Sequence, residues 1–200
     1  MLVHAIMPAS RANGPGLRCV VFVQGCNLNC AGCFNPWSHA FHGPDLAIEA
    51  ILAEVLRCRR QYSLDGVTFS GGEPMQQADD LAELLPGLRS ALPTFSLGMF
   101  TGYSEKELET GRYFTRHGVD RDRRRALWRS IRGQLDFAVM GRYNRLQPSH
   151  APMCSSANQV LRLFSARHTE VDFGAQTVEI TIAADGLTRT TGFPTLGNPA

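Results

Sequence analysis

The sequence lacks any apolar run long enough to cross a membrane. Its longest unbroken hydrophobic segment is residues 19–23, far short of the ~20 residues that a transmembrane helix needs. Residues 1–8 carry neither a basic flank nor a continuous apolar stretch, so they do not show the pattern of a secretory signal. We therefore expect a protein of the cytoplasm with no membrane partner.

Lysine is almost missing as well. Lys106 is the only lysine, and the rest of the positive charge is arginine. With 20 Lys and Arg against 18 Asp and Glu, the formal net charge is only +2, which argues against a general binder of polyanions. We expect no nucleic-acid partner, and any basic function must be local.

Length and hydrophobic content limit the number of domains. The 200 residues correspond to about one domain, and a hydrophobic share of 44% is sufficient for a packed core. We expect a core domain over residues 1–165 and a β-ribbon extension of the same domain over residues 166–200.

Short apolar runs alternate along the chain with stretches of helical periodicity. This pattern predicts an α/β fold with parallel strands joined by crossover helices. Strands are expected at residues 17–23, 66–70, 95–100 and 135–139. Helices are expected at about 45–60, around 81–88 and at 120–132, with Asp45 capping the first and Pro86 kinking or splitting the second.

The C-terminal region has a different periodicity. Val178, Ile180 and Ile182 alternate with polar residues, and the dipeptide Asp185-Gly186 is a hairpin turn signal. We expect the chain to end in an antiparallel β-hairpin.

Three of the six cysteines fall close together, at Cys26, Cys30 and Cys33, in a loop that follows a buried strand. Such clustering in a reducing compartment favours metal binding over a disulfide framework. In a [4Fe–4S] cube, three thiolates leave one iron open for a substrate or cofactor. Cys19, Cys58 and Cys154 are scattered, and the helical position of Cys58 favours a small core residue.

Other readings of this cluster remain open. A zinc site would need His39 or His42 as a fourth ligand, and C-x3-C-x2-C before histidine is not a common zinc spacing. A ferredoxin would need a fourth cysteine in a recognised position, which the sequence does not provide. Otherwise we interpret the histidines as surface or packing residues, namely His39, His42, His117 and His168.

A second motif, Ser70-Gly71-Gly72-Glu73-Pro74, directly follows the second expected strand. The glycine pair permits close approach of a ligand to the backbone, and the Glu73 carboxylate can accept hydrogen bonds from a ligand ammonium group. Alone, this segment is equally well explained as a turn before a helix.

The two motifs in this order resemble those of the radical S-adenosylmethionine superfamily. Residues 13–18 and 22–25 are similar to the opening of the glycyl-radical-enzyme activases. Within that group the motifs at 30–35, 101–103 and 141 are most similar to those of anaerobic ribonucleotide reductase activating proteins. The resemblance covers about residues 13–160 and implies a partial (β/α) barrel of the radical S-adenosylmethionine type, followed here by the C-terminal antiparallel β-hairpin.

The resemblance also implies roles for particular residues. Cys26, Cys30 and Cys33 would ligate a [4Fe–4S] cluster, which would cleave S-adenosylmethionine to methionine and a 5′-deoxyadenosyl radical. The methionine ammonium group would be held by Gly71, Gly72 and Glu73. The adenine side would be bound by Gly32 and Phe34, with Thr101 as a further polar contact. Phe34 has plain packing as an equal alternative.

The partners implied are a large glycyl-radical enzyme as the protein substrate and an electron donor of the flavodoxin or ferredoxin type. The arginines of residues 120–132 are a solvated helix face or a docking patch for one of these partners; they are Arg121, Arg123, Arg124, Arg125, Arg129 and Arg132.

Two other functions stay open. One is a radical enzyme that modifies a peptide or small molecule, as the 7-carboxy-7-deazaguanine synthases do. The other is a non-catalytic iron–sulfur or zinc module. Three features depart from the activase pattern and leave the radical acceptor undecided. They are an extra alanine within residues 155–159, the loop at 143–154 and the terminal ribbon.

Overall fold

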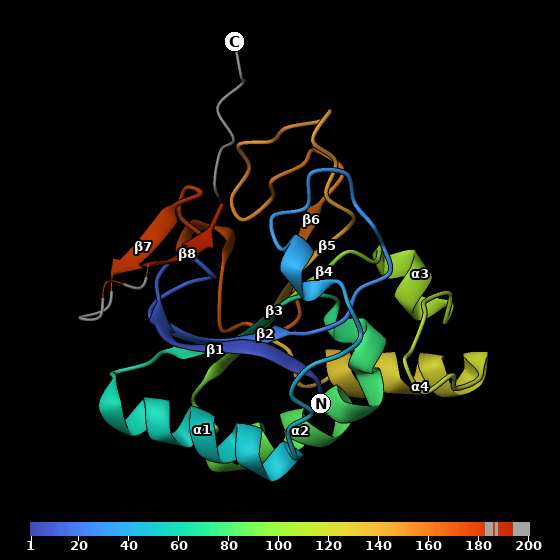
Figure 1. The fold of residues 1–200 in the computed structure, drawn as a ribbon, viewed down its shortest axis with the longest axis horizontal. Helices are drawn as coiled ribbons and strands as arrows, with labels where there is room; N and C mark the ends of the chain where they lie inside the picture. The colour runs from blue at the N-terminus through green and yellow to red at the C-terminus, as the bar shows by residue number, and fades with distance from the viewer. Residues whose placement is uncertain (183–185, 187, 194–200) are drawn as a thin grey trace.

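The computed structural model describes residues 1–182, 186 and 188–193, and its central feature is a six-stranded sheet (Figure 1). Its strands are β1 (Val3–Ser10), β2 (Arg18–Val23), β3 (Gly66–Gly71), β4 (Ser96–Thr101), β5 (Phe137–Met140) and β6 (Val160–Leu163), hydrogen-bonded in that order. β2 to β5 are parallel, whereas β1 and β6 pair antiparallel at the two edges. The parallel strands are almost entirely buried, because both faces of the sheet are covered.

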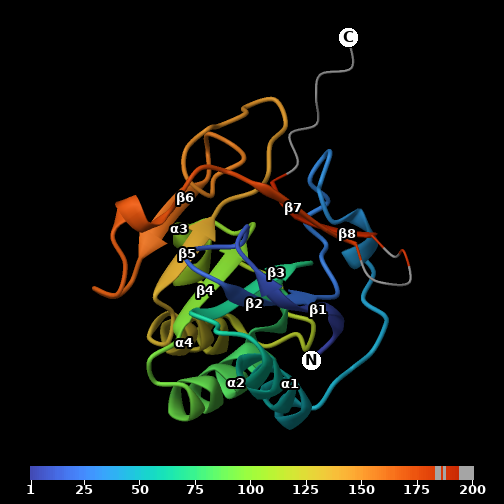
Figure 2. The same ribbon diagram turned by 90° about the vertical axis from the view of Figure 1, so that its left-hand side faces the viewer.

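Helices α1 (Ile48–Gln61), α2 (Ala78–Ala91) and α4 (Arg121–Arg132) lie together on one side of the sheet (Figures 1 and 2). The short helix α3 (Glu105–Glu109) precedes α4, and the 3-10 turns are η1 (Pro36–Ser38), η2 (Pro74–Gln77) and η3 (Glu170–Asp172). α2 buries four leucines completely, each burial contributing roughly 1.5–3 kcal/mol. Cys58 is fully buried in the same core, as its helical position predicts. None of the described helices is long and apolar enough to span a bilayer.

One predicted helix detail is wrong, and a second is wrong in one of its two alternatives. α1 begins at Ile48 with Ala47 as its N-cap, whereas the Asp45 carboxylate binds the N-terminal ammonium group at 2.8 Å and Arg116 at 3.2 Å. A carboxylate with two cationic partners is more strongly bound than one that caps a helix. α2 is not split at Pro86, because the buried leucines on either side of the proline hold both halves against the core.

Neither edge strand, β1 nor β6, was predicted from the sequence. The residues of β1 are mostly half-exposed, and two register irregularities interrupt its pairing with β2. The residues of β6 are alternately exposed and half-buried. The expected strands and the helix at 120–132, capped by Asp120, are confirmed.

The C-terminal antiparallel hairpin is confirmed as β7 (Val178–Ile182) paired with β8 (Thr188–Gly192). Of the expected turn, Gly186 has a φ of +84°, while Asp185 lies outside the described residues. Figure 2 shows the hairpin across the sheet from α1 and α2. Asn13 Nδ2 donates to Thr191 Oγ1 at 2.9 Å and fastens the hairpin to the loop after β1. The α/β class is confirmed, whereas the barrel and the domain boundary at residue 165 stay predictions.

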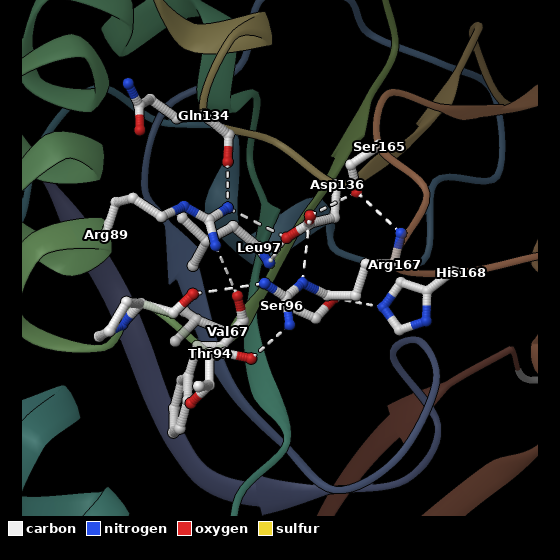
Figure 3. Close-up of polar contacts among 12 residues, drawn as sticks. Val67, Arg89, Thr94, Ser96, Leu97, Gln134, Asp136, Ser165, Arg167 and His168 are labelled. Atoms are coloured by element: carbon white, nitrogen blue, oxygen red, sulfur yellow. Dashed lines mark hydrogen bonds and ion pairs between the residues drawn. The ribbon is translucent and has the colours of Figure 1, made fainter.

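The amino ends of β4 and β5 are closed by a polar network around Asp136 (Figure 3). This carboxylate is 4% exposed and receives Arg89 at 3.0 Å and Arg167 at 3.3 Å. It also accepts hydrogen bonds from the Ser165 hydroxyl at 2.6 Å and the Leu97 amide at 2.9 Å. Burial alone would raise the pKa of Asp136, but these partners together lower it.

Candidate functional site

The loops that follow β2, β3, β4 and β5 meet at one edge of the sheet, because parallel strands end on the same side. They form a cleft that contains the predicted site residues Cys26, Cys30, Cys33, Phe34, Gly71, Gly72, Glu73 and Thr101. Of the predicted site residues, only Gly32 lies outside this lining. Gly32 is exposed, and a Cβ there would come within 3.3 Å of the Arg145 side chain and 3.6 Å of the Tyr143 side chain.

The cysteine loop is shaped by its backbone. Gly25 and Gly32 have φ values of +106° and +76°, which favour glycine. The Cys26 amide donates to the His39 carbonyl at 2.9 Å, and the Cys33 amide donates to the Cys30 carbonyl at 3.1 Å. These bonds fold the three half-buried thiols into one side of the cleft.

Electrostatics disfavour free thiolates in this loop. Burial, together with the nearby Glu73 and the other two cysteines, raises the pKa of Cys26 to about 12. Burial also raises the pKa of Cys30. Thiolates at Cys26 and Cys30 therefore need added positive charge, which bound iron would supply.

The glycine pair is required by packing between two loops. A Cβ on Gly72 would lie 2.5 Å from the Gly25 carbonyl oxygen, and Gly71 has a φ of +94°. The Glu73 amide donates to that same Gly25 carbonyl at 2.9 Å. The motif after β3 is thus pressed against the cysteine loop, which brings Glu73 near the thiols.

Glu73 is 1% exposed and is fixed by three neutral donors. Its Oε1 accepts from the Thr101 hydroxyl at 2.7 Å and the Met75 amide at 2.9 Å, and its Oε2 accepts from the Gly102 amide at 2.7 Å. No Lys, Arg or His within the described ranges forms an ion pair with it. Burial raises the pKa of Glu73 to about 7, against the effect of these hydrogen bonds.

Thr101 uses its hydroxyl within the protein. It donates to Glu73 and accepts from the Tyr103 amide at 3.2 Å. Although Thr101 lines the cleft, its polar group is committed to holding the carboxylate. Its part in a binding site is therefore that of a positioning residue.

One wall of the cleft is aromatic. The rings of Phe34 and Tyr143 lie 4.7 Å apart, centroid to centroid. Tyr143 and Met153 belong to the loop for which the sequence suggested no role, and both line the cleft. Gln159 also lines it and donates to the Gly141 carbonyl at 3.1 Å, which ties the segment 155–159 to the end of β5.

The terminal hairpin supplies a further wall that the sequence did not predict. Asn13, Gly192 and Phe193 line the cleft, and the Phe193 ring lies 5.9 Å from that of Phe100. These contacts join residues far apart in the chain, so no local pattern could have indicated them.

His39, which we expect to be a surface or packing residue, is half-buried in the structure. It lines the cleft, and its Nε2 atom is buried without a hydrogen-bond partner in the described structure. His42 is not part of the lining. Across the described ranges, no three His, Cys, Asp or Glu side chains are arranged to hold a single metal ion. A four-iron cube carries its thiolates on separate irons, so the cysteines need not converge on one point.

Comparisons with known proteins agree with this donor set. The family described as "4Fe-4S single cluster domain" matches residues 12–162, which include all three cysteines. The chain is 38% identical over 112 residues to the pyruvate formate-lyase-activating enzyme of Clostridium pasteurianum, covering 52% of this chain and 46% of that protein.

Two anaerobic ribonucleoside-triphosphate reductase-activating proteins are also similar. That of Escherichia coli K12 is 31% identical over 116 residues, covering 54% of this chain and 73% of the relative. That of Pasteurella multocida Pm70 is 31% identical over 166 residues, covering 79% of this chain and 94% of the relative. The chain therefore spans less than half of the Clostridium enzyme but nearly all of the Pasteurella protein.

Proposed function

Because the chain belongs to the 4Fe-4S single cluster domain family and to the radical S-adenosylmethionine activases of glycyl-radical enzymes, we propose that it generates a glycyl radical on a large partner enzyme. The partner that best fits the motifs is an anaerobic ribonucleotide reductase. The proposed reaction uses S-adenosylmethionine and one electron from a flavodoxin or ferredoxin type donor.

The observation that carries this proposal is the buried Glu73 carboxylate beside the three cysteines. It is held by neutral donors and lacks a cationic partner among the described residues, so a cationic ligand group matches it. The three thiols in the same cleft are a donor set that fits a [4Fe–4S] cluster with one open iron.

Cys26, Cys30 and Cys33 would hold the cluster. When bound and reduced, it supplies the electron that breaks the sulfonium C–S bond of S-adenosylmethionine, giving methionine and a 5′-deoxyadenosyl radical that takes hydrogen from a glycine Cα. The residues of this chain bind and orient the reactants, and no side chain is required as an acid or base.

Glu73 would bind the ammonium group of the methionine part, and its three donors keep both carboxylate oxygens in place. Gly71 and Gly72 allow the loop to approach the ligand without side chains. Phe34 would pack on the adenine, supported by the Tyr143 ring behind it. The backbone at Gly32 would complete this adenine side.

The test is anaerobic reconstitution with iron and sulfide, reduction with dithionite in the presence of S-adenosylmethionine, and assay for 5′-deoxyadenosine. The native protein should form it, and Cys30→Ala should form none because one cluster ligand is lost. Cys154→Ala is the matched control, since Cys154 is buried outside the cleft lining and should leave the iron and sulfide content unchanged.

The identity of the radical acceptor needs a second readout. Mixing with an anaerobic ribonucleotide reductase should produce a glycyl signal by electron paramagnetic resonance. Formation of 5′-deoxyadenosine without that signal would instead favour a peptide or small-molecule acceptor. Zinc without sulfide in the purified protein would contradict both enzyme functions.

A further inference from the structure

A second hollow adjoins the cysteine loop and shares Leu28 of that loop with the cleft. It is a groove lined by Asn27, Leu28, Tyr103, Arg112, Tyr113, Phe114, Arg124 and Arg142, and we call it the arginine groove. Asn27 and Leu28 stand between Cys26 and Cys30 in the chain. Leu28 is the one residue that lines both the cleft and the arginine groove. The loop that carries the thiols therefore forms part of the groove's lining.

The lining of the arginine groove is cationic and aromatic. Three arginines contribute to it and no carboxylate does, but Arg124 is bound to the Tyr113 carbonyl and Arg142 to Glu107, which leaves Arg112 as the lining arginine bound neither to a backbone carbonyl nor to a carboxylate among the described residues. Arg112 is exposed, and its Nε donates only to the Thr110 hydroxyl, at 3.1 Å, in the described structure. Arg142 lies 5.5 Å above the Tyr103 ring and pairs with Glu107 at the rim, at 3.0 Å.

An exposed aromatic surface continues from the groove. Phe114 is 43% exposed, and its ring lies 5.8 Å from that of Phe41, which is 39% exposed. Arginine, tyrosine and phenylalanine are enriched at protein interfaces. A cationic groove with an aromatic rim is complementary to an acidic protein surface.

We propose that the arginine groove is the docking site of an acidic one-electron carrier protein, an inference that rests on the proposed function. The carrier loses one electron, the oxidised cluster held by the neighbouring cysteines gains it, and no bond forms or breaks. An electron can be transferred from a docked carrier to the cluster through Leu28 and its backbone, without direct contact between the two redox groups. Hydrogen abstraction from a glycine Cα needs direct contact with the reacting group, so the radical acceptor must enter through the cleft instead.

The arginines of α4 form a poorer docking surface. Arg123, Arg125 and Arg132 pair with Asp79, Asp122 and Glu109 at 3.4, 2.5 and 3.9 Å. Arg121 donates to the Thr110 carbonyl at 2.7 Å. Arg124 is bound to the Tyr113 carbonyl and accepts at its own carbonyl from the Tyr113 hydroxyl. Most of this face is internally neutralised, and Arg124 is a structural residue whose reversal would disturb the fold.

The test compares Arg112→Glu with Arg129→Glu, an exposed arginine of α4 outside the arginine groove. Reduction of the reconstituted cluster is followed by its visible absorbance after rapid mixing with reduced flavodoxin, a small acidic carrier. Arg112→Glu should slow this reduction roughly tenfold or more at low salt and flatten its salt dependence, because a steering charge is reversed. Arg129→Glu and Arg112→Lys should keep the native rate.

Two controls separate docking from the chemistry. Reduction by dithionite should proceed at the native rate in Arg112→Glu, because a small reductant needs no groove. Calorimetric binding of flavodoxin to the protein before reconstitution should weaken by a similar factor, which requires no cluster.

Equal flavodoxin rates and affinities in the native protein and Arg112→Glu would overturn the docking proposal. A variant that is reduced normally but no longer forms a glycyl radical would overturn it too, by assigning the groove to the radical acceptor. Failure of the proposed function has a different signature, namely no 5′-deoxyadenosine from native protein reduced with dithionite.

Discussion

Two buried carboxylates lie at opposite ends of the same parallel strands, and they differ in their partners. Asp136, at the amino end, is 4% exposed and pairs with Arg89 and Arg167 (Figure 3). Glu73, beyond the carboxyl end of β3, is 1% exposed and is held by a hydroxyl and two amides. Their pKa values consequently shift in opposite directions, down for Asp136 and up for Glu73.

The difference indicates what each end of the sheet does. A carboxylate whose charge is balanced by two arginines closes the structure and stabilises it. A carboxylate that is fixed in place but forms no ion pair within the described residues is costly to ionise, and this cost would be recovered when a cationic ligand binds. This is the physical basis for proposing that the carboxyl edge binds a cationic ligand.

The largest expected effect is on ligand affinity. Glu73→Gln should weaken S-adenosylmethionine binding to the reconstituted protein about a hundredfold, or about 2.7 kcal/mol, because a buried ion pair is lost. Equilibrium binding by calorimetry under anaerobic conditions measures it. Asp136→Asn, which changes the carboxylate at the other end, should bind as the native protein does. Equal affinities in Glu73→Gln and the native protein would contradict the role of Glu73 in binding the ligand.

The next effect is on stability. Asp136→Ala should lower the free energy of unfolding by about 2.5 kcal/mol, because it strands Arg89, the Leu97 amide and the Ser165 hydroxyl in a mostly buried network. Urea unfolding measures it. Asp122→Ala is the control, since the Asp122 side chain is 82% exposed and its pair with Arg125 contributes at most about 0.5 kcal/mol. A loss no greater than that of the control would contradict a structural role for Asp136.

The smallest effect is a pH dependence with opposite signs at the two ends. The raised pKa of Glu73 gives stability that is complete below its unfolded pKa and is lost as pH rises through about 7. The lowered pKa of Asp136 gives stability that is complete above its unfolded pKa and is lost as pH falls below it.

In the protein before reconstitution, the contribution of Glu73 should fall by about 2 kcal/mol between pH 5.5 and 7.5. The measurement is the difference in unfolding free energy between native protein and Glu73→Gln at several pH values. As the pH rises over this range, the native protein should lose stability relative to Glu73→Gln. A pH-independent difference would show that Glu73 is ionised without cost.

The sequence predicted those residues of the cleft that belong to short motifs of neighbouring residues. The cysteine spacing and the Gly71-Gly72-Glu73 motif follow buried strands, so the parallel topology was enough to bring them together. The motif alone could not indicate that Gly72 packs on the Gly25 carbonyl, because that contact depends on where two loops meet.

The remaining walls depend on contacts between distant parts of the chain. Asn13 and Thr191 are 178 residues apart, and although Asn13 begins the segment 13–18 that resembles the activases, nothing in that segment indicates its contact with the hairpin. Arg142 and Tyr143 could not be predicted as site residues either, because their side chains become part of the site only where the fold places them next to the cysteine loop. Asp45 has the residue type of a cap but lies two residues before the N-cap Ala47 and binds cationic partners from other segments.

The most direct test of the account asks whether the cleft binds a cluster with an open iron. Anaerobically reconstituted, reduced protein is mixed with S-adenosylmethionine labelled with nitrogen-15 at its amino group and studied by electron–nuclear double resonance. We expect coupling from the label, showing that the methionine part lies on one iron of a cube held by Cys26, Cys30 and Cys33. A cube with a fourth ligand from the protein, or no cube at all, would contradict it.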